Sequence, residues 1–178
     1  MPTQIVLLRG INLASKRRVG MSDLRDLLES EGHEDVRTHL QSGNVVLSSP
    51  LSPRRLETAL ERLLRKRFGF DVRVLVRTRA ELKKVVERDP LGDVATNGSR
   101  YLVSFLSKKL PAKIARELEG ADIAPEQVVV DGREIYGWHP TGVQRSKLAR
   151  LLGDERLGVT ATTRNWNTVT KLLELADG

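Results

Sequence analysis

The stretch VRTHLQSGNVVLSS, residues 36–49, decides how the first half of the chain folds. Two short runs of β-forming residues flank Ser42-Gly43. A glycine between such runs supplies the backbone conformation of a tight turn. We therefore predict a β-hairpin, and the segments on either side of it determine the topology of this half.

Those neighbouring segments have the apolar spacing of helices. MSDLRDLLESEG (21–32) places three leucines on one helical face, with Ser22 as the expected N-cap and a glycine as the stop. SPRRLETALERLLRKRFG (52–69) begins with Ser52 as an N-cap, has proline at the first helical position, and repeats apolar residues at helical spacing. A helix therefore precedes the hairpin and another follows it.

The outermost segments of this half read as strands. TQIVLLRG (3–10) is an apolar run of β-formers, and DVRVLVRT (71–78) alternates as a strand does. The resulting order, β-α-β-β-α-β, is the split βαβ pattern of ferredoxin-like domains. Right-handed crossovers then place both helices on one face of a four-stranded antiparallel sheet.

The second half of the chain repeats this order. Its strands are expected at 100–107, in a hairpin around Asp131-Gly132 and at 157–162, and its helices at 110–120, 141–154 and 163–177. The predicted fold class is α+β, with two ferredoxin-like (βαββαβ) halves. The expected divisions are an N-terminal half at 1–78, a helix and linker at 79–99, and a C-terminal half with a terminal helix at 100–178.

The composition limits the class of protein. Lys and Arg total 30 against 23 acidic residues, and the resulting net charge of +7 attracts phosphates and nucleic acids. No stretch approaches the roughly 18 apolar residues of a membrane span, and the first residues lack the features of a signal peptide. The absence of cysteine excludes disulfides, zinc–thiolate sites and iron–sulfur clusters. We expect a cytoplasmic protein that uses no membrane, metal or cofactor.

The residues indicate no particular reaction. The three histidines, His33, His39 and His139, do not stand at metal-ligand spacings. Neither a GxxxxGK[ST] phosphate loop nor a GxGxxG dinucleotide turn is present. No pair of carboxylates indicates general acid–base chemistry. Whether the protein is an enzyme stays open.

Three groups of polar residues are candidate binding sites, and the first follows the first strand. Arg9, Gly10 and Asn12 precede a cationic run that includes Lys16 and Arg17. A strand-to-helix connection that ends at a helix N-terminus is a ready anion site, because free backbone N–H groups and the helix dipole both favour negative charge. The alternative is that the glycine makes the turn, the asparagine caps it and the cations are solvated.

The second group is the turn of the predicted hairpin, which consists of Gln41, Ser42, Gly43 and Asn44. Its amides could recognise the edge of a base or a sugar. Alternatively, the asparagine and glycine serve only the turn, since both residue types favour turn conformations.

The third group consists of two helix starts in the second half. Arg145, Ser146 and Lys147 crowd the first turn of one helix, where cations oppose the helix dipole, and Asp154 is a candidate compensating partner. The start of the last helix carries more polar groups than one cap requires. They include Arg164, Asn165 and Asn167.

Three separated stretches, LLRGINLASKRRVGMSDLRDLLESEGHEDVRTHLQSGNVVLSS (7–49), WHPTGVQRSKL (138–148) and TATTRNWNTVTKLLEL (160–175), resemble the bacterial family known as domain of unknown function 1697. The resemblance extends from residue 5 to about residue 175. It implies an α+β protein of two ferredoxin-like halves and implies no activity. The loop LASKRRV after Asn12 is richer in arginine than is usual in this family. The motif positions map onto Arg9, Gly10, Asn12, Gln41, Ser42, Gly43, Asn44, Pro140, Gly142, Arg145, Ser146, Lys147, Arg164, Asn165, Trp166, Asn167 and Thr168.

Three functions remain open. The first is a module that binds an anionic ligand, either nucleic acid or a phosphorylated metabolite, although no central strand carries the run of aromatics that base stacking would need. The second is a structural junction, in which the polar motifs only hold the two halves together. The third is an enzyme for a small phosphorylated or carboxylated substrate, with arginines as clamps and Ser42 or Asn44 as polar catalytic groups. This third reading predicts that residues 9–12, 41–44 and 164–168 converge in one pocket.

Overall fold

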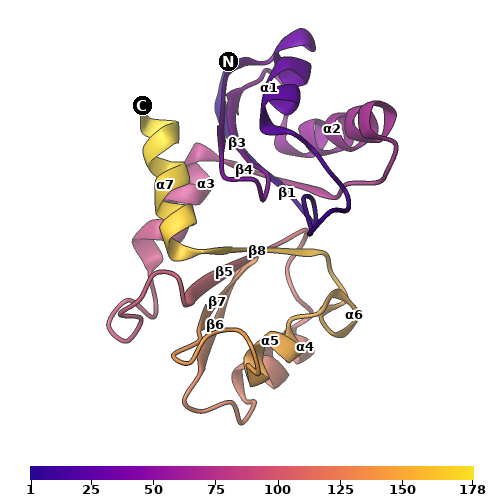
Figure 1. Ribbon diagram of the computed structural model, residues 1–178. Helices are drawn as coiled ribbons and strands as arrows, with labels where there is room; N and C mark the ends of the chain where they lie inside the picture. Colours follow the sequence, from indigo (N-terminus) through magenta and orange to yellow (C-terminus); the bar gives the residue numbers. More distant parts are fainter. The chain divides into compact units, whose positions relative to one another are not determined.

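The computed structural model describes all 178 residues, and the chain forms two compact units. Unit 1 comprises Met1–Lys84 and Lys171–Gly178, and unit 2 comprises Val85–Thr170 (Figure 1). The three-part division that the sequence suggests stays a prediction, and each unit is described by itself. None of the helices combines the length and the apolar character that crossing a membrane requires.

Unit 1 has the connectivity that the sequence predicts. Its antiparallel sheet has the strand order β2-β3-β1-β4, with the first strand in the interior. This order agrees with the ferredoxin-like description of the half. The elements are β1 (Thr3–Leu8), α1 (Met21–Ser30), β2 (Glu34–His39), β3 (Asn44–Ser48), α2 (Pro53–Phe68) and β4 (Val74–Thr78), followed by the start of α3 (Arg79–Arg88).

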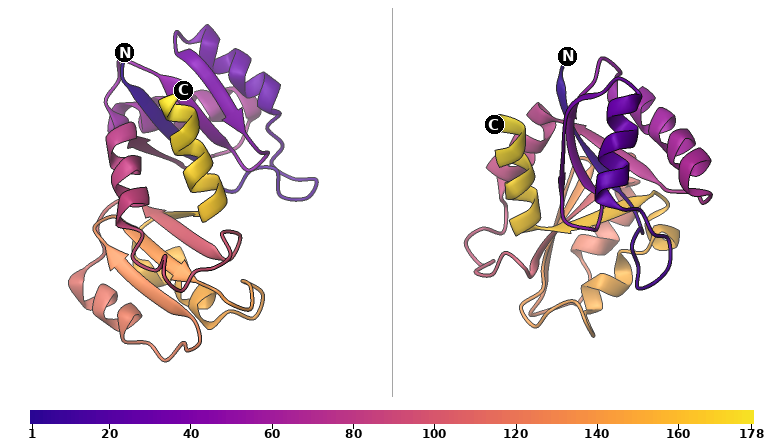
Figure 2. Two further views of the ribbon diagram at one scale, coloured as in Figure 1. Left: turned by 90° about the vertical axis from the view of Figure 1, so that its left-hand side faces the viewer. Right: turned by 45° about the horizontal axis from the view of Figure 1, so that its top comes forward.

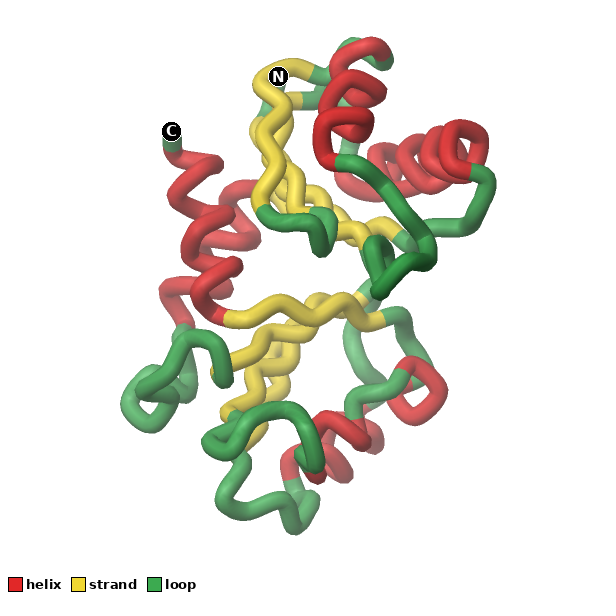
Figure 3. Tube along the Cα trace, viewed as in Figure 1, coloured by secondary structure: helices red, strands yellow, loops and turns green.

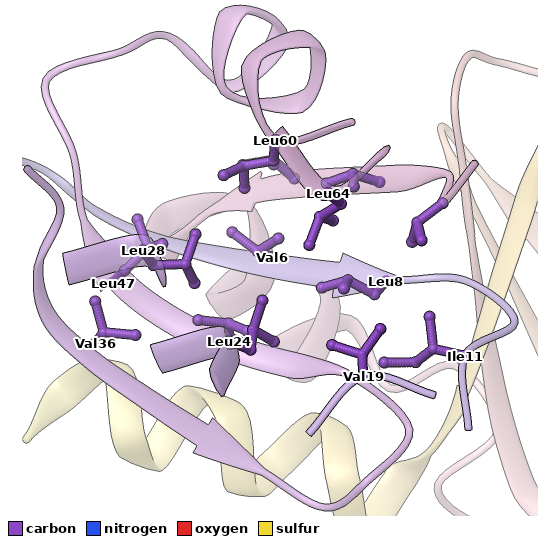
Figure 4. Close-up of a cluster of buried hydrophobic side chains, with 14 of the residues drawn as sticks. Val6, Leu8, Ile11, Val19, Leu24, Leu28, Val36, Leu47, Leu60 and Leu64 are labelled. Atoms are coloured by element: carbon purple, nitrogen blue, oxygen red, sulfur yellow. The ribbon is translucent and has the colours of Figure 1, made fainter. Parts of the chain in front are cut away.

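The two helices of unit 1 pack on one face of its sheet. Leucines at helical spacing on α1 and α2 point at the valines and leucines of β1 and β3 and form one apolar core (Figure 4). Ser52 caps α2 as predicted, because its Oγ accepts a hydrogen bond from the backbone N–H of Arg55 at 3.3 Å. Helix α1 differs from the prediction: Gly20 is its N-cap, and Ser22 lies within the first turn.

The inner strands of unit 1, β1 and β3, are buried on both faces. Val6 and Leu8 belong to the core under α1 and α2, whereas Ile5 and Leu7 alternate with them and point to the opposite face. Ile5 is 0% exposed and Leu7 is 1% exposed. Because both faces of the inner strands are covered, these strands cannot present bases with a stacking surface of the kind that RNA-binding sheets use.

Unit 2 is also built on a four-stranded antiparallel sheet, so the predicted α+β class is confirmed. Its strand order is β6-β7-β5-β8, which repeats the order of unit 1. Figure 2 shows the strands of both units in two further views. Helices α3 and α7 each contribute residues to both units. The elements are β5 (Tyr101–Leu106), α4 (Ala112–Glu119), β6 (Gln127–Asp131), β7 (Glu134–Trp138), α5 (Lys147–Leu151), α6 (Asp154–Leu157), β8 (Ala161–Asn165) and α7 (Trp166–Asp177).

Unit 2 departs from the sequence prediction in its last third. The single helix expected at 141–154 is replaced by two short helices, α5 and α6, with a break at Gly153 (Figure 3). The last strand begins at Ala161 rather than at residue 157, because Gly158 takes a left-handed conformation with φ 71° that ends α6. Residues 163–165, expected in the last helix, are therefore strand.

Carboxylates close three of the four sheet edges. The outward N–H groups of Val74 and Val76 on edge strand β4 donate to Glu61 and Glu57 of α2, at 3.2 and 2.9 Å. On β6, Val130 N–H donates to a Glu119 carboxylate oxygen of α4 at 3.4 Å, and the β8 edge is closed in the same way by Asp154 of α6. Unpaired N–H groups on an edge strand attract other strands, so these carboxylates protect the edges.

Candidate functional site

The loop after β1 is a compact structure with little free backbone. Asn12 N–H donates to Arg17 O at 2.8 Å, and Lys16 N–H donates to Leu13 O at 2.9 Å, so the loop folds back on itself. Four of its residues have positive φ: Gly10, Asn12, Ala14 and Arg17, at 66°, 53°, 51° and 53°. Residues other than glycine rarely adopt this backbone conformation, so contacts with the surrounding residues must stabilise it.

The Asn12 side chain supplies three of those contacts. Its Oδ1 accepts from Val19 N–H at 2.9 Å, and its Nδ2 donates to Val19 O at 2.9 Å and to Gln41 O at 2.7 Å. One amide thus closes the loop and attaches it to the β2–β3 hairpin. Asn12 thus makes the contacts that the structural alternative expects of it.

Arg17 fixes the other side of the loop. Its Nε donates to Gly10 O and its guanidinium donates to Asp71 O, both at 2.5 Å. The same guanidinium lies over the ring of Phe70, 4.8 Å from the centroid. Arg17 therefore joins the loop to the segment that precedes β4. These contacts hold its guanidinium charge beside Asp71 and Phe70.

The hairpin turn packs directly against the end of β1. Leu8 N–H donates to Gly43 O at 2.9 Å, and a Cβ at Gly43 would lie 2.8 Å from the Leu8 Cβ. Gly43 also has φ 90°, so glycine is required at this position. Asn44 is fully buried, and its Nδ2 donates to His39 O at 2.8 Å and to Ser42 Oγ at 3.0 Å.

The structure thus brings the first two predicted motifs together at one end of unit 1. The residues that hold this end are Gly10, Asn12, Arg17, Gly43 and Asn44. Gln41 and Ser42 are exposed at the turn beside them. The meeting of these motifs with residues 164–168 stays a prediction.

Exposed cations surround the same end. The side chains of Lys16, Arg18 and Arg73 are exposed and form no hydrogen bond or ion pair. Arg73 lies there because its carbonyl accepts from Arg9 N–H at 2.9 Å, which continues the ladder between β1 and β4. Sequence reasoning missed Arg73, and the pairing of the two strands was the signal that could have found it. We call Arg9, Lys16, Arg17, Arg18 and Arg73 the cationic end.

In unit 2, Ser146 belongs to a buried polar cluster. His139 Nδ1 lies 3.0 Å from Glu126 Oε2 and 2.9 Å from Ser146 Oγ, and Ser146 Oγ donates to Glu126. A nucleophilic serine must bond the imidazole nitrogen opposite the one that the carboxylate orients. Here both groups lie at Nδ1, and His139 is 0% exposed, so the cluster is structural.

Titration of this cluster follows from its burial. Burial raises the pKa of Glu126, but hydrogen bonds from Ser146, Leu148 N–H and Lys147 N–H, together with His139, outweigh this effect and hold the pKa below its ordinary value. Burial lowers the pKa of His139, and Glu126 opposes this change only in part. The cluster is therefore built around an ionised carboxylate and a neutral imidazole.

The predicted cations of this region are exposed. Arg145, at φ 63°, and Lys147 stand beside the first turn of α5. The Glu126 carboxylate complements the dipole at this end of α5, because its Oε1 accepts from the backbone N–H of Lys147 at 2.8 Å. Asp154, the predicted compensating partner, accepts from the N–H of Ala161 at 3.2 Å, and its compensating role stays a prediction.

The polar start of α7 also has structural roles. Asn165 is the cap, since its Oδ1 accepts from Thr168 N–H at 2.9 Å. The Asn167 side chain lies against Gly98, where a Cβ would come 2.1 Å from its Oδ1. Trp166 stacks on Tyr101 with ring centroids 4.6 Å apart. Arg164 donates to the carbonyl of Thr163 at 2.9 Å, and burial lowers the pKa of Arg164 to about 10.

A cavity of about 660 Å³ in unit 1 is not suited to an anion. It lies beside β2 and is lined by His33 and Arg37, but also by Glu29, Glu34 and Asp35. The carboxylates outnumber the single arginine, so the cavity repels negative charge. No group of three or more His, Asp or Glu side chains is arranged to hold a metal ion.

The fold and the candidate site define an α+β protein of two four-stranded antiparallel units, the first with a cationic loop, held by side-chain hydrogen bonds, at the end of its sheet. The chain belongs to the family described as "Protein of unknown function (DUF1697)", whose sequence model matches residues 1–136. The motifs at 138–148 and 160–175 lie beyond the matched residues.

Solved structures include one that is similar over nearly the whole chain. The conserved bacterial protein SP0830 from Streptococcus pneumoniae has a TM-score of 0.78 and 21% sequence identity, over 98% of each chain. This likeness shows the shared fold. No curated protein matches the chain.

Proposed function

We propose that unit 1 binds a phosphate-bearing anion at the cationic end, as a cytoplasmic binding module. The proposal rests on one observation: three cations of the cationic end have no ion-pair partner. Lys16, Arg18 and Arg73 are exposed and unpaired, whereas the nearby carboxylate of Asp71 is engaged with Arg65 at 2.6 Å. Phosphate is bound most readily by cations that have no competing partner.

The rigidity of the loop supports the same conclusion. The side chains of Asn12 and Arg17 donate hydrogen bonds of 2.5–2.9 Å to backbone carbonyls. These bonds hold the segment that carries Lys16 and Arg18. A site whose backbone is already ordered loses less entropy when a ligand binds. The positive-φ residues then have a role beyond the turn itself, since backbone strain is commonly retained at binding sites.

The charge distribution also favours this end. Unit 1 carries 18 of the 30 lysines and arginines but only 12 of the 23 acidic residues, so nearly all of the net charge of +7 belongs to it. Such an excess raises the local concentration of anions and their association rate.

The test compares two variants that lose the same charge. K16A/R18A/R73A removes the unpaired cations of this end, and K108A/K109A/K113A removes three exposed lysines of unit 2. The probe is a fluorescein-labelled six-nucleotide DNA strand, followed by fluorescence polarisation at about 50 mM salt. We expect the first variant to lose about 10- to 100-fold in affinity, because it loses several phosphate contacts.

The control should change affinity by no more than about threefold, which is the effect of long-range charge at this ionic strength. Equal losses in both variants would mean that only the net charge attracts the probe, and the proposal would be wrong. Circular dichroism of both variants checks that they remain folded.

A further inference from the structure

Helix α2 separates its charges between its two sides. Its two acidic residues, Glu57 and Glu61, turn to the sheet and accept from the N–H groups of Val76 and Val74 at 2.9 and 3.2 Å. Both carboxylates are half-buried there. The outward side of the helix is therefore left with cations and no carboxylate of its own.

Three arginines on that side surround one shallow hollow. Arg54, Arg55 and Arg62 line it together with Thr58 and Ala59, its volume is about 310 Å³, and no acidic residue contributes to it. The three guanidinium groups are exposed, and none forms a hydrogen bond or ion pair. The neighbouring hollow, beyond Arg62, does include one carboxylate, that of Glu31.

Two of these arginines stand where a helix does not favour them. Arg54 and Arg55 occupy the first turn of α2, which contains no acidic residue. A cation at this end opposes the helix dipole and costs roughly 0.3–1 kcal/mol at an exposed position. Helix stability therefore does not account for them, whereas an external anion does.

The arginines form a path that leads to the cationic end. At 1.5 Å per residue, Arg62 lies about 12 Å along the axis from Arg54, and Lys66 lies about 6 Å further. The helix ends at Phe68, and the following segment reaches the cationic end, where Arg17 donates to Asp71 O at 2.5 Å. The whole helix spans about 24 Å. A phosphorylated metabolite would cover only a fraction of this length.

If the anion is a nucleic acid, the aromatic residues of unit 1 indicate whether it is a single strand or a duplex. Binding of a single strand relies on aromatic side chains on which bases stack. The only Phe, Tyr and Trp residues of unit 1 are Phe68 and Phe70, which are half-buried against the core and covered by Arg67 and Arg17. Unit 1 therefore offers cations at intervals, which suits a duplex whose bases are already stacked.

We propose that the anion bound by unit 1 is a nucleic-acid duplex, whose phosphate backbone runs along α2 from Arg54 and Arg55, past Arg62, to the cationic end. This inference rests on the proposed function and extends it to a substrate class and a second contact surface.

The experiment measures how affinity for a labelled 20-base-pair DNA duplex depends on salt, for the wild type, R54A/R55A/R62A and the control K108A/K109A/K113A. Each phosphate contact adds about 0.9 to the slope of log K against log salt. We expect the α2 variant to reduce the slope by about 2 to 3, and the control to change it by less than about 1. A slope equal to that of the wild type or the control would overturn the inference.

Two further measurements separate its failure from failure of the proposed function. The α2 variant should bind the six-nucleotide strand within about twofold of the wild type, because that probe is short enough for the cationic end alone. If K16A/R18A/R73A retains full affinity for the short strand, the proposed function fails, whatever the α2 variant does. A 20-nucleotide single strand that binds more tightly than the duplex would overturn the duplex assignment alone. The three arginines make no hydrogen bond or ion pair that stabilises the fold, and two of them oppose the helix dipole, so the melting temperature of the variant should not fall below that of the wild type.

Discussion

Replacing Asn12 tests the physical basis of the candidate site. N12A removes three hydrogen bonds of 2.7–2.9 Å that connect the loop to itself and to the hairpin. Each is worth about 1 kcal/mol net, but Asn12 is half-buried and water replaces part of the loss, which leaves about 2 kcal/mol. Alanine at φ 53° adds about 1 kcal/mol of backbone strain. We therefore expect unit 1 to lose about 3 kcal/mol of unfolding free energy.

A second variant separates the two contributions. N12G loses the same hydrogen bonds, but glycine adopts positive φ without strain, so its loss should be smaller than that of N12A by about 1 kcal/mol. Equal losses would show that the strain term is absent.

The choice of probe follows from the positions of the tryptophans. Trp138 and Trp166 both belong to unit 2, so tryptophan fluorescence does not report directly on unit 1. Urea unfolding is therefore followed by far-ultraviolet circular dichroism. Hydrogen exchange at the amide of Val19, which donates to the Asn12 side chain at 2.9 Å, gives the local reading. A loss below about 0.5 kcal/mol in N12A, with exchange at Val19 unchanged, would refute this account of the loop.

Two other predictions concern the hairpin and the buried histidine. G43A should destabilise unit 1 by more than about 2 kcal/mol, because a Cβ would lie 2.8 Å from that of Leu8 at φ 90°, and a loss below about 1 kcal/mol in urea unfolding would contradict this. The pKa of His139 lies below its ordinary 6.5 in the folded state, so the unfolded chain binds the proton first, and stability present above pH 6.5 is lost as the pH falls through the folded value. Unfolding monitored by tryptophan fluorescence should show this loss between pH 7 and 5, and a flat profile would contradict it.

The sequence predicts elements better than it predicts partners. The hairpin around Ser42-Gly43 and the flanking helices follow from local spacing, and their order yields the correct α+β class. The predicted boundaries of the last strand and the last helix, between residues 157 and 165, were wrong. Strand β8 is defined by its pairing with β5, and no local sequence pattern reports that pairing. Periodicity reports local burial and not which distant strand completes a sheet.

The same limit explains the candidate site. The contact between the loop after β1 and the hairpin turn could be inferred, because both connect strands of the same sheet. That the Asn12 side chain bonds to backbone groups could not be predicted, since its contact with Gln41 reaches 29 residues along the chain. The position of Arg73 follows only once β1 is paired with β4, because its contact with Arg9 spans 64 residues. The buried cluster around Ser146 has no local signal for the same reason, because its partner Glu126 lies 20 residues away along the chain.

The carboxylates at the sheet edges also bear on how the protein behaves when it is crowded. A strand that approaches β4 finds Val74 and Val76 already engaged with Glu61 and Glu57. An added strand must displace the two glutamate side chains before it can hydrogen-bond to β4, so growth of fibrils from this edge is slow to start. The helix that presents arginines to the solvent therefore also helps to keep neighbouring copies of the chain apart.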